Sequence, residues 1–129
     1  MDIDRPEVIA EVARAFAQYE RALVSNDVQT LGALFLDDAR TIRYGAGENL
    51  YGFAEIERYR RARPSHGLDR RLSRTVITTY GNDFAVASTL FERDGDPAKI
   101  GRQMQSWVRL PQGWRIVAAH VSVIDRPAD

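Results

Sequence analysis

Hydrophobic positions in the first part of the chain recur every three or four residues, the spacing of one face of a helix. The pattern predicts a first helix with the buried stripe Ile9, Val12, Phe16, Tyr19 and Leu23. Asp4 is placed to cap this helix, because Pro6 and Glu7 follow at positions typical of a first helical turn.

Polar and glycine-containing breaks divide the next part of the chain. The polar run 25–27 ends the first helix and caps a second one. Short strands are expected at 41–44 and 48–51, and apolar positions at helical spacing predict a third helix over 53–63.

Beyond Asp69 the hydrophobic period changes to two, which is typical of strands. The pattern predicts four long strands near 70–80, 83–93, 99–110 and 114–124. Turns rich in Gly, Pro, Asn and Asp separate these strands, so they should form an antiparallel meander. Helices followed by such a meander predict a single α+β domain over residues 1–129, with one face of the sheet buried against the helices.

The other face of the expected sheet is too apolar to be fully solvated. It is expected to carry Trp107, Val117, Val121 and Val123. We therefore predict that this outer face packs against a second copy of the chain in a two-fold homodimer.

The last hairpin decides which polar residues face the helices. With a three-residue loop at 111–113, Arg102 lies opposite Ser122 and Met104 lies opposite His120. Arg102, His120 and Ser122 would then gather at the polar end of the concave face. A two-residue loop would instead turn Gln103, Gln105 and Trp107 inward.

Composition and charge exclude several classes of function. The formal net charge is zero, which argues against non-specific binding to nucleic acid or to an anionic membrane. No apolar run is long enough to span a bilayer, and the N-terminus lacks the apolar stretch of a signal peptide, so a cytoplasmic protein is expected. The chain has no cysteine and only two histidines, far apart, so we expect neither a metal site nor a cofactor.

Few residues stand out as candidates for chemistry on the local pattern alone. Tyr19 lies on the buried stripe, where a hydrogen-bonded core tyrosine is the usual case. Arg43, between two apolar residues of a short strand, either points to solvent or is buried against an anion. Arg60 and Arg63 could overhang a pocket mouth or form a solvated helix face, and His120 is more often a core or rim residue than a catalyst.

The order of elements resembles the cystatin-like cone of the SnoaL-like, nuclear-transport-factor-like superfamily. That resemblance implies a strongly curved, mostly antiparallel sheet with the N-terminal helices on its concave face. A closer resemblance is to the AtzH-like family, which includes the HpxZ-like proteins of oxalurate catabolism. It is carried by Tyr19-Glu20-Arg21-Ala22-Leu23, Asn26-Asp27, Arg43-Tyr44-Gly45, Glu48-Asn49-Leu50-Tyr51-Gly52, the segment 101–107 and the segment 113–122.

The AtzH-like resemblance implies a hydrolase that needs no metal and acts on C–N bonds of a small ureido carboxylate. The implied substrates are 1,3-dicarboxyurea, converted to allophanate, or an oxalurate-like compound. Carried over by position, the important tyrosine and arginine are Tyr19 and Arg43, the arginine as a carboxylate clamp and the tyrosine as a proton donor or acceptor. Arg60, Arg102, His120 and Ser122 would complete substrate binding. Met104 departs from the small polar residue expected there, which leaves the exact substrate open.

Two other functions remain open at this point. The HpxZ-like resemblance equally allows a non-catalytic subunit that binds such a ligand or supports a partner amidase in nitrogen catabolism. An isomerase or dehydratase of the wider superfamily would need an inward-facing Asp–His pair, which the sequence does not place.

Overall fold

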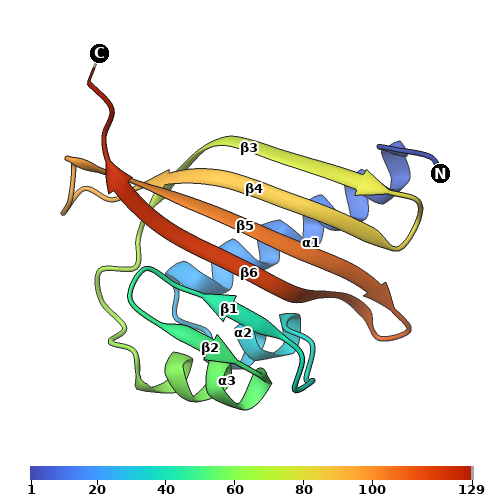
Figure 1. The fold of residues 1–129 in the computed structure, drawn as a ribbon, viewed down its shortest axis with the longest axis horizontal. Coiled ribbons are helices and arrows are strands. Elements are labelled where there is room, and N and C mark those ends of the chain that lie inside the picture. The colour runs from blue at the N-terminus through green and yellow to red at the C-terminus, as the bar shows by residue number, and fades with distance from the viewer. Residues whose placement is uncertain (129) are drawn as a thin grey trace.

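The fold has three helices and six strands within residues 1–128, the part of the chain that the computed structural model describes (Figure 1). In chain order the elements are α1 (Pro6–Val24), α2 (Val28–Leu34), β1 (Ile42–Tyr44), β2 (Asn49–Tyr51), α3 (Phe53–Ala62), β3 (Arg71–Tyr80), β4 (Phe84–Glu92), β5 (Lys99–Leu110) and β6 (Gly113–Asp125). All nine correspond to elements that the hydrophobic pattern predicts.

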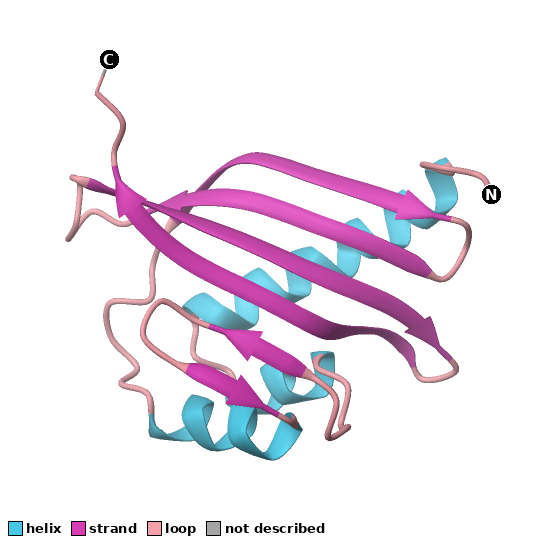
Figure 2. Cartoon of the chain, viewed as in Figure 1, coloured by secondary structure: helices cyan, strands magenta, loops and turns pink. Residues whose placement is uncertain are grey.

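The strands form one sheet in the order β2-β1-β6-β5-β4-β3. All neighbours are antiparallel except β1 and β6, which run parallel. The long strands curve, and the helices lie on one side of the sheet (Figure 2). We call the helix-facing side the inner face and the opposite side the outer face. The expected α+β architecture with a mostly antiparallel sheet is confirmed.

Helix α1 lies along the inner face and supplies much of the core. Its buried side chains follow the predicted stripe, with Val8 in place of Ile9: Val8, Val12, Phe16, Tyr19, Ala22 and Leu23. They pack with Trp107, Ile116 and other inner-face residues of the sheet in one cluster. Burial of this stripe, rather than intrinsic helix propensity, is what holds a helix of this length in place.

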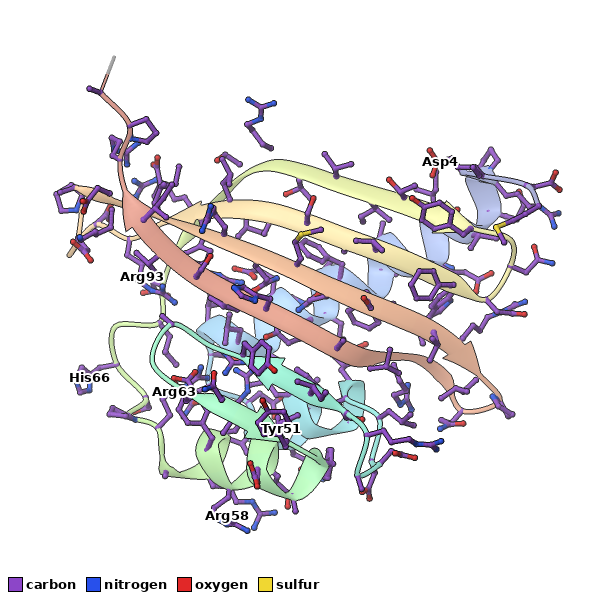
Figure 3. The ribbon with its side chains drawn as sticks, viewed as in Figure 1. Asp4, Tyr51, Arg58, Arg63, His66 and Arg93 are labelled. Atoms are coloured by element: carbon purple, nitrogen blue, oxygen red, sulfur yellow. The ribbon has the colours of Figure 1, made fainter. Side chains whose placement is uncertain are left out.

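The expected cap of α1 is wrong in one respect. Arg5 is the N-cap residue, and no side chain caps the helix. Asp4 instead has a left-handed backbone, with φ 61°, and its carboxylate accepts a hydrogen bond of 3.0 Å from the backbone N–H of Thr79. It therefore ties the N-terminus to β3, as its position in Figure 3 indicates. Asp27 caps α2 as predicted, accepting from the N–H of Thr30 at 3.2 Å.

The last hairpin combines both of the registers considered from the sequence. Next to the turn, Leu110 pairs with Gly113, which makes a two-residue loop. The register shifts between Ser106 and Trp107, where β6 contains one extra residue, Val117. Beyond this bulge the predicted pairs hold, including Arg102 with Ser122 and Met104 with His120.

The bulge reverses which residues face the helices. Trp114 and Ile116 are buried on the inner face as expected, but beyond Val117 the inner positions are Ala119 and Val121. On β5 the inward residues are Gln103, Gln105 and Trp107, all at most 2% exposed. Trp107, expected on the outer face, is thus a core residue.

Candidate active site

Tyr19 is buried at the centre of the molecule. The stripe of α1 directs it toward the sheet, and it is 2% exposed. Its hydroxyl accepts a hydrogen bond of 2.8 Å from Nη2 of Arg60, which comes from α3. The hydroxyl proton is therefore free to be donated elsewhere.

The electrostatic surroundings of Tyr19 favour its ionised form. Burial alone raises the pKa of a phenol, but the positive charges of Arg60, Arg43 and Arg70 and the Arg60 hydrogen bond outweigh it. The net result is a Tyr19 pKa below its ordinary value. A phenol with a lowered pKa is a better proton donor near neutral pH than an ordinary tyrosine.

Arg43 is buried, which decides between the two alternatives that the sequence leaves open. It lies in the middle of β1, paired with Ala119 of β6, and its side chain is 7% exposed. Nη1 donates to Oε1 of Glu48 at 2.9 Å, and the guanidinium carbon lies 5.4 Å from the centre of the Tyr59 ring. Its Nε has no hydrogen-bond partner.

Gly45 allows Glu48 to reach Arg43. A Cβ at position 45 would lie 1.6 Å from Oε1 of Glu48, so any other residue would displace the carboxylate. The glycine in the turn between β1 and β2 is therefore part of how this chain places an acidic partner beside Arg43.

Arg60 is more deeply buried than a pocket-mouth position implies. It is 2% exposed on α3, and its Nε and Nη1 have no partner. Burial, followed by repulsion from Arg43, lowers its pKa. Arg58, two residues earlier, is exposed and points away from the helix into solvent (Figure 3). Two residues, a little over half a turn of α3, thus separate a site arginine from a surface arginine.

A cavity of about 240 Å³ lies next to Tyr19 and Arg43. Its walls include the apolar residues Leu23, Phe91 and Val121. Its polar lining is dominated by arginine, with Arg43, Arg63, Arg70, Arg93, Tyr19, Glu48 and Gln103. A small, partly open space with several guanidinium groups is suited to a small anion.

Only part of this positive charge is neutralised by the protein. Arg70 makes a two-pronged ion pair with Glu20, with contacts of 2.9 and 2.6 Å, and Arg43 has Glu48. Among residues 1–128, no carboxylate lies within ion-pairing distance of Arg60, Arg63 or Arg93. Arg63 and Arg93 line the cavity and lie at the same end of the molecule (Figure 3).

The pKa values of these two arginines reflect the same excess of charge. Burial and the neighbouring Arg60 lower the pKa of Arg63 to about 10. Burial and the neighbouring Arg70 lower the pKa of Arg93. Each guanidinium would be stabilised by an added negative charge.

The buried polar atoms without partners around the cavity are all hydrogen-bond donors. Within the described chain they are Nε of Arg43, Nε and Nη1 of Arg60, Nε of Arg63, Nε of Arg93 and Nε2 of Gln103. Buried donors are rarely left without an acceptor in folded proteins. A ligand rich in acceptor oxygens, such as a carboxylate, would satisfy several of them at once.

Three predicted binding residues lie on the other side of the sheet. Arg102 and His120 are exposed on the outer face, and Ser122 is half-buried there. Arg102 Nε donates to Ser122 Oγ at 3.1 Å, so the predicted proximity of this pair is correct. The expected face is wrong because the bulge at Val117 shifts the alternation of β6 by one residue.

The cavity contains residues that the sequence reasoning did not assign to a site. Arg70 was not among the candidates, and Gln103 was inward only in the alternative register. Arg93 follows β4, and the sequence around it does not mark it as a site residue. Its place beside the cavity depends on how the loops 63–70 and 93–98 fold.

The described part of the chain has neither a membrane-spanning helix nor a metal-binding cluster. No helix in the described part of the chain is long and apolar enough to cross a membrane. Residues 1–128 contain no group of three or more His, Cys, Asp or Glu side chains arranged to hold a metal ion.

Comparison with solved structures identifies close relatives. A protein of the DUF3225 family from Pectobacterium atrosepticum is 61% identical, with 96% of each chain covered and a TM-score of 0.94. A cystatin-like fold protein from Burkholderia xenovorans is 46% identical, covering 98% of this chain and 99% of the other, also with a TM-score of 0.94.

More distant structures share the fold. An NTF2-like protein from Pseudomonas putida is 17% identical, covering 97% of this chain and 90% of the other, with a TM-score of 0.78. No curated protein matches the chain. The family model described as AtzH-like matches residues 1–127. The chain has a cystatin-like fold, which it shares with NTF2-like proteins, and it belongs to the AtzH-like family.

Proposed function

We propose that this protein is a small hydrolase that cleaves a C–N bond of a ureido carboxylate, such as 1,3-dicarboxyurea or an oxalurate-like compound. The observation that carries the proposal is the arginine-lined cavity around which the unpartnered buried atoms are all donors, placed beside a tyrosine with a lowered pKa. AtzH-like membership supports the same substrate class.

The arginines would bind the carboxylates of the substrate. Arg43 is the closest to a fixed clamp, because Glu48 and Tyr59 hold its guanidinium in place and leave Nε free. Arg63 and Arg93, with no carboxylate partner, would take a second anionic group near the open end of the cavity.

Tyr19 would supply the proton that the reaction requires. In an N-carboxylated urea, water adds to the carboxyl carbon as the bond between this carbon and nitrogen breaks, and the electron pair of that bond goes to the nitrogen. The nitrogen takes the Tyr19 proton, and the carbon leaves as carbonic acid, which loses a proton to become bicarbonate. The phenolate, stabilised by the Arg60 hydrogen bond of 2.8 Å, then regains a proton from solvent.

A turnover assay tests this proposal. Purified protein treated with a chelator would be given 1,3-dicarboxyurea, 1-carboxybiuret, allophanate and oxalurate, and ammonia and carbon dioxide would be followed. We expect product from one of these compounds. Arg43→Gln should weaken binding of that compound by about 100-fold, because a buried ionic hydrogen bond is lost, while Arg58→Gln on the exposed side of α3 should have no effect.

The rival function makes a different prediction in the same assay. A ligand-binding or accessory subunit of an amidase would release nothing from any compound but would be stabilised against heat by one of them. That outcome would replace the hydrolase proposal with the accessory role.

A further inference from the structure

Gln103 is a buried polar residue that the proposed chemistry has not used. It lies on the inner face of β5, between Thr89 of β4 and Val121 of β6, and is 2% exposed. It forms part of the cavity wall together with Arg70 and Tyr19. A long polar side chain in this position requires hydrogen-bond partners for both ends of its amide.

Neighbouring residues fix the orientation of the Gln103 amide. Arg70 Nη2 donates to Oε1 of Gln103 at 2.9 Å. A guanidinium has no acceptor, so the amide NH2 cannot occupy that side. Arg70 is itself held by the two-pronged pair with Glu20, and its side chain is 2% exposed. The relay from Glu20 through Arg70 therefore leaves the NH2 group of Gln103 on the opposite side of the amide.

That NH2 group has no partner within the described chain. It is also different in kind from the other free donors around the cavity, which all belong to guanidinium groups. Guanidinium groups match the two oxygens of a carboxylate, whereas a neutral amide N–H matches a single carbonyl oxygen. A ureido carboxylate has such a carbonyl oxygen between its two nitrogens.

We propose that Nε2 of Gln103 donates a hydrogen bond to the ureido carbonyl oxygen of the substrate, an inference that rests on the proposed function. When the C–N bond breaks, the electron pair left on nitrogen is shared with this carbonyl oxygen until the Tyr19 proton arrives. A donor held at that oxygen stabilises the negative charge as it develops. Gln103 is thus a catalytic residue, and Arg70 and Glu20 are positioning residues that set its orientation.

A matched pair of non-ureido ligands tests this role without relying on turnover. Glutarate and 3-oxoglutarate are both dicarboxylates with a chain of five carbon atoms, counting the carboxyl carbons. The chain of 1,3-dicarboxyurea also has five atoms. The two dicarboxylates differ only by the central carbonyl oxygen. Calorimetric titration of the wild type, with fresh ligand in the cold, should show 3-oxoglutarate binding about tenfold more tightly, since one hydrogen bond separates the ligands.

Variants then show whether Gln103 is the donor. Gln103→Met, of similar length, should abolish the preference while leaving the affinity for glutarate within about twofold. Arg70→Met should reduce the preference for 3-oxoglutarate, because the Gln103 amide is then free to rotate. The ratio of the two affinities is insensitive to a general loss of structure, which would weaken binding of both ligands alike. The control Gln18→Met, at an exposed position of α1, should leave the ratio unchanged.

The outcomes separate this inference from the function on which it rests. Equal affinity of the wild type for both ligands, or a preference that persists in Gln103→Met, would overturn the role of Gln103 alone. Failure of the wild type to bind either dianion would overturn the anion site and, with it, this assignment.

Discussion

The inner and outer faces of the sheet are built from the same strands but carry opposite chemistry near the cavity. On β5, Gln103 and Gln105 face inward and are 2% and 1% exposed, whereas Met104 between them is 54% exposed on the outer face. The polar residues are buried and the apolar residue is in contact with solvent. A strand that reverses the usual pattern has to satisfy its buried amides, and the ligand proposed for the cavity would do so for Gln103.

The outer face also has its own aromatic group. The hydroxyls of Tyr44 and Tyr51 lie 2.9 Å apart, and the Tyr44 ring meets His120 edge-on with centres 6.0 Å apart. Tyr51, 54% exposed, lies on this side in Figure 3. Of Tyr19, Tyr44 and Tyr51, Tyr19 alone is buried, and it lies among cations. The surroundings, rather than the residue type, therefore determine which tyrosine can do chemistry.

The largest expected effect is on catalysis at the inner face. Tyr19→Phe should lower kcat by about 10²- to 10⁴-fold with KM little changed, because the proton donor is lost while the arginines remain. Steady-state kinetics with the substrate found in the turnover assay would measure this. Tyr44→Phe on the outer face is the matched control. A similar kcat for the Tyr19 variant and this control would remove the proposed acid role.

The next effect is on stability. Gly101 on β5 lies directly under the Phe91 ring, and a Cβ there would come within 2.0 Å of it. Phe91 in turn supports the guanidinium groups of Arg70 and Arg93, at 4.5 and 4.9 Å from the ring centre. Gly101→Ala should therefore lower the free energy of unfolding by about 1–3 kcal/mol.

Urea denaturation would measure the change in stability. Gly95→Ala, which has open space around its Cβ, is the control and should be nearly neutral. Wild-type stability of Gly101→Ala would show that the ring can move aside, and its proposed role in supporting the arginines would then be lost.

A smaller effect concerns the pH dependence of turnover. Tyr19 donates a proton only when protonated, so activity is present below its pKa and is lost as pH rises through it. Arg60 is the strongest of the charges that lower this pKa, acting against burial. Arg60→Gln should raise the Tyr19 pKa, so that the alkaline limb of the kcat profile moves to higher pH. The limb should not move in Arg58→Gln, and an unmoved limb in Arg60→Gln would show that Tyr19 is not the titrating group.

The smallest effect on the folded chain is expected at the outer face. Met104→Lys places a charge on a side chain that is already 54% exposed, so the unfolding free energy of the monomer should change by only about 0.5 kcal/mol. The homodimer through this face stays a prediction. If it forms, the same variant should dissociate it, which sedimentation velocity would detect. A dimer that survives the substitution would have to use another surface.

Much of the fold follows from local pattern. The stripe of α1, the Asp27 cap and the change of period after residue 69 each depend on neighbouring residues, and each was predicted. The bulge at Val117 was not predicted. One extra residue in a strand leaves the residue types unchanged, but the residues beyond it exchange faces of the sheet. This single residue accounts for the wrong face assigned to Arg102, His120 and Ser122.

The site was only partly predictable for a similar reason. Tyr19 and Arg43 were identified with the help of the family resemblance, and the structure brings both to one cavity. Arg93 and Gln103 reach the same cavity through loop conformation and register, which are tertiary properties. Arg43 itself could not be assigned to the interior until its contacts with Glu48 and Tyr59 were known.

The arginines around the cavity also affect how a ligand arrives. The four arginines that line the cavity, together with Arg60 behind Tyr19, exceed their neighbours Glu48 and Glu20 by three positive charges. The whole chain has a formal net charge of zero. The rest of the molecule therefore carries an equal surplus of negative charge. With screening over about 8 Å at physiological ionic strength, an approaching anion meets a mildly acidic exterior until it is close to the mouth. Long polyanions are repelled there, while a short anion that reaches the mouth is captured by contact rather than steered from a distance.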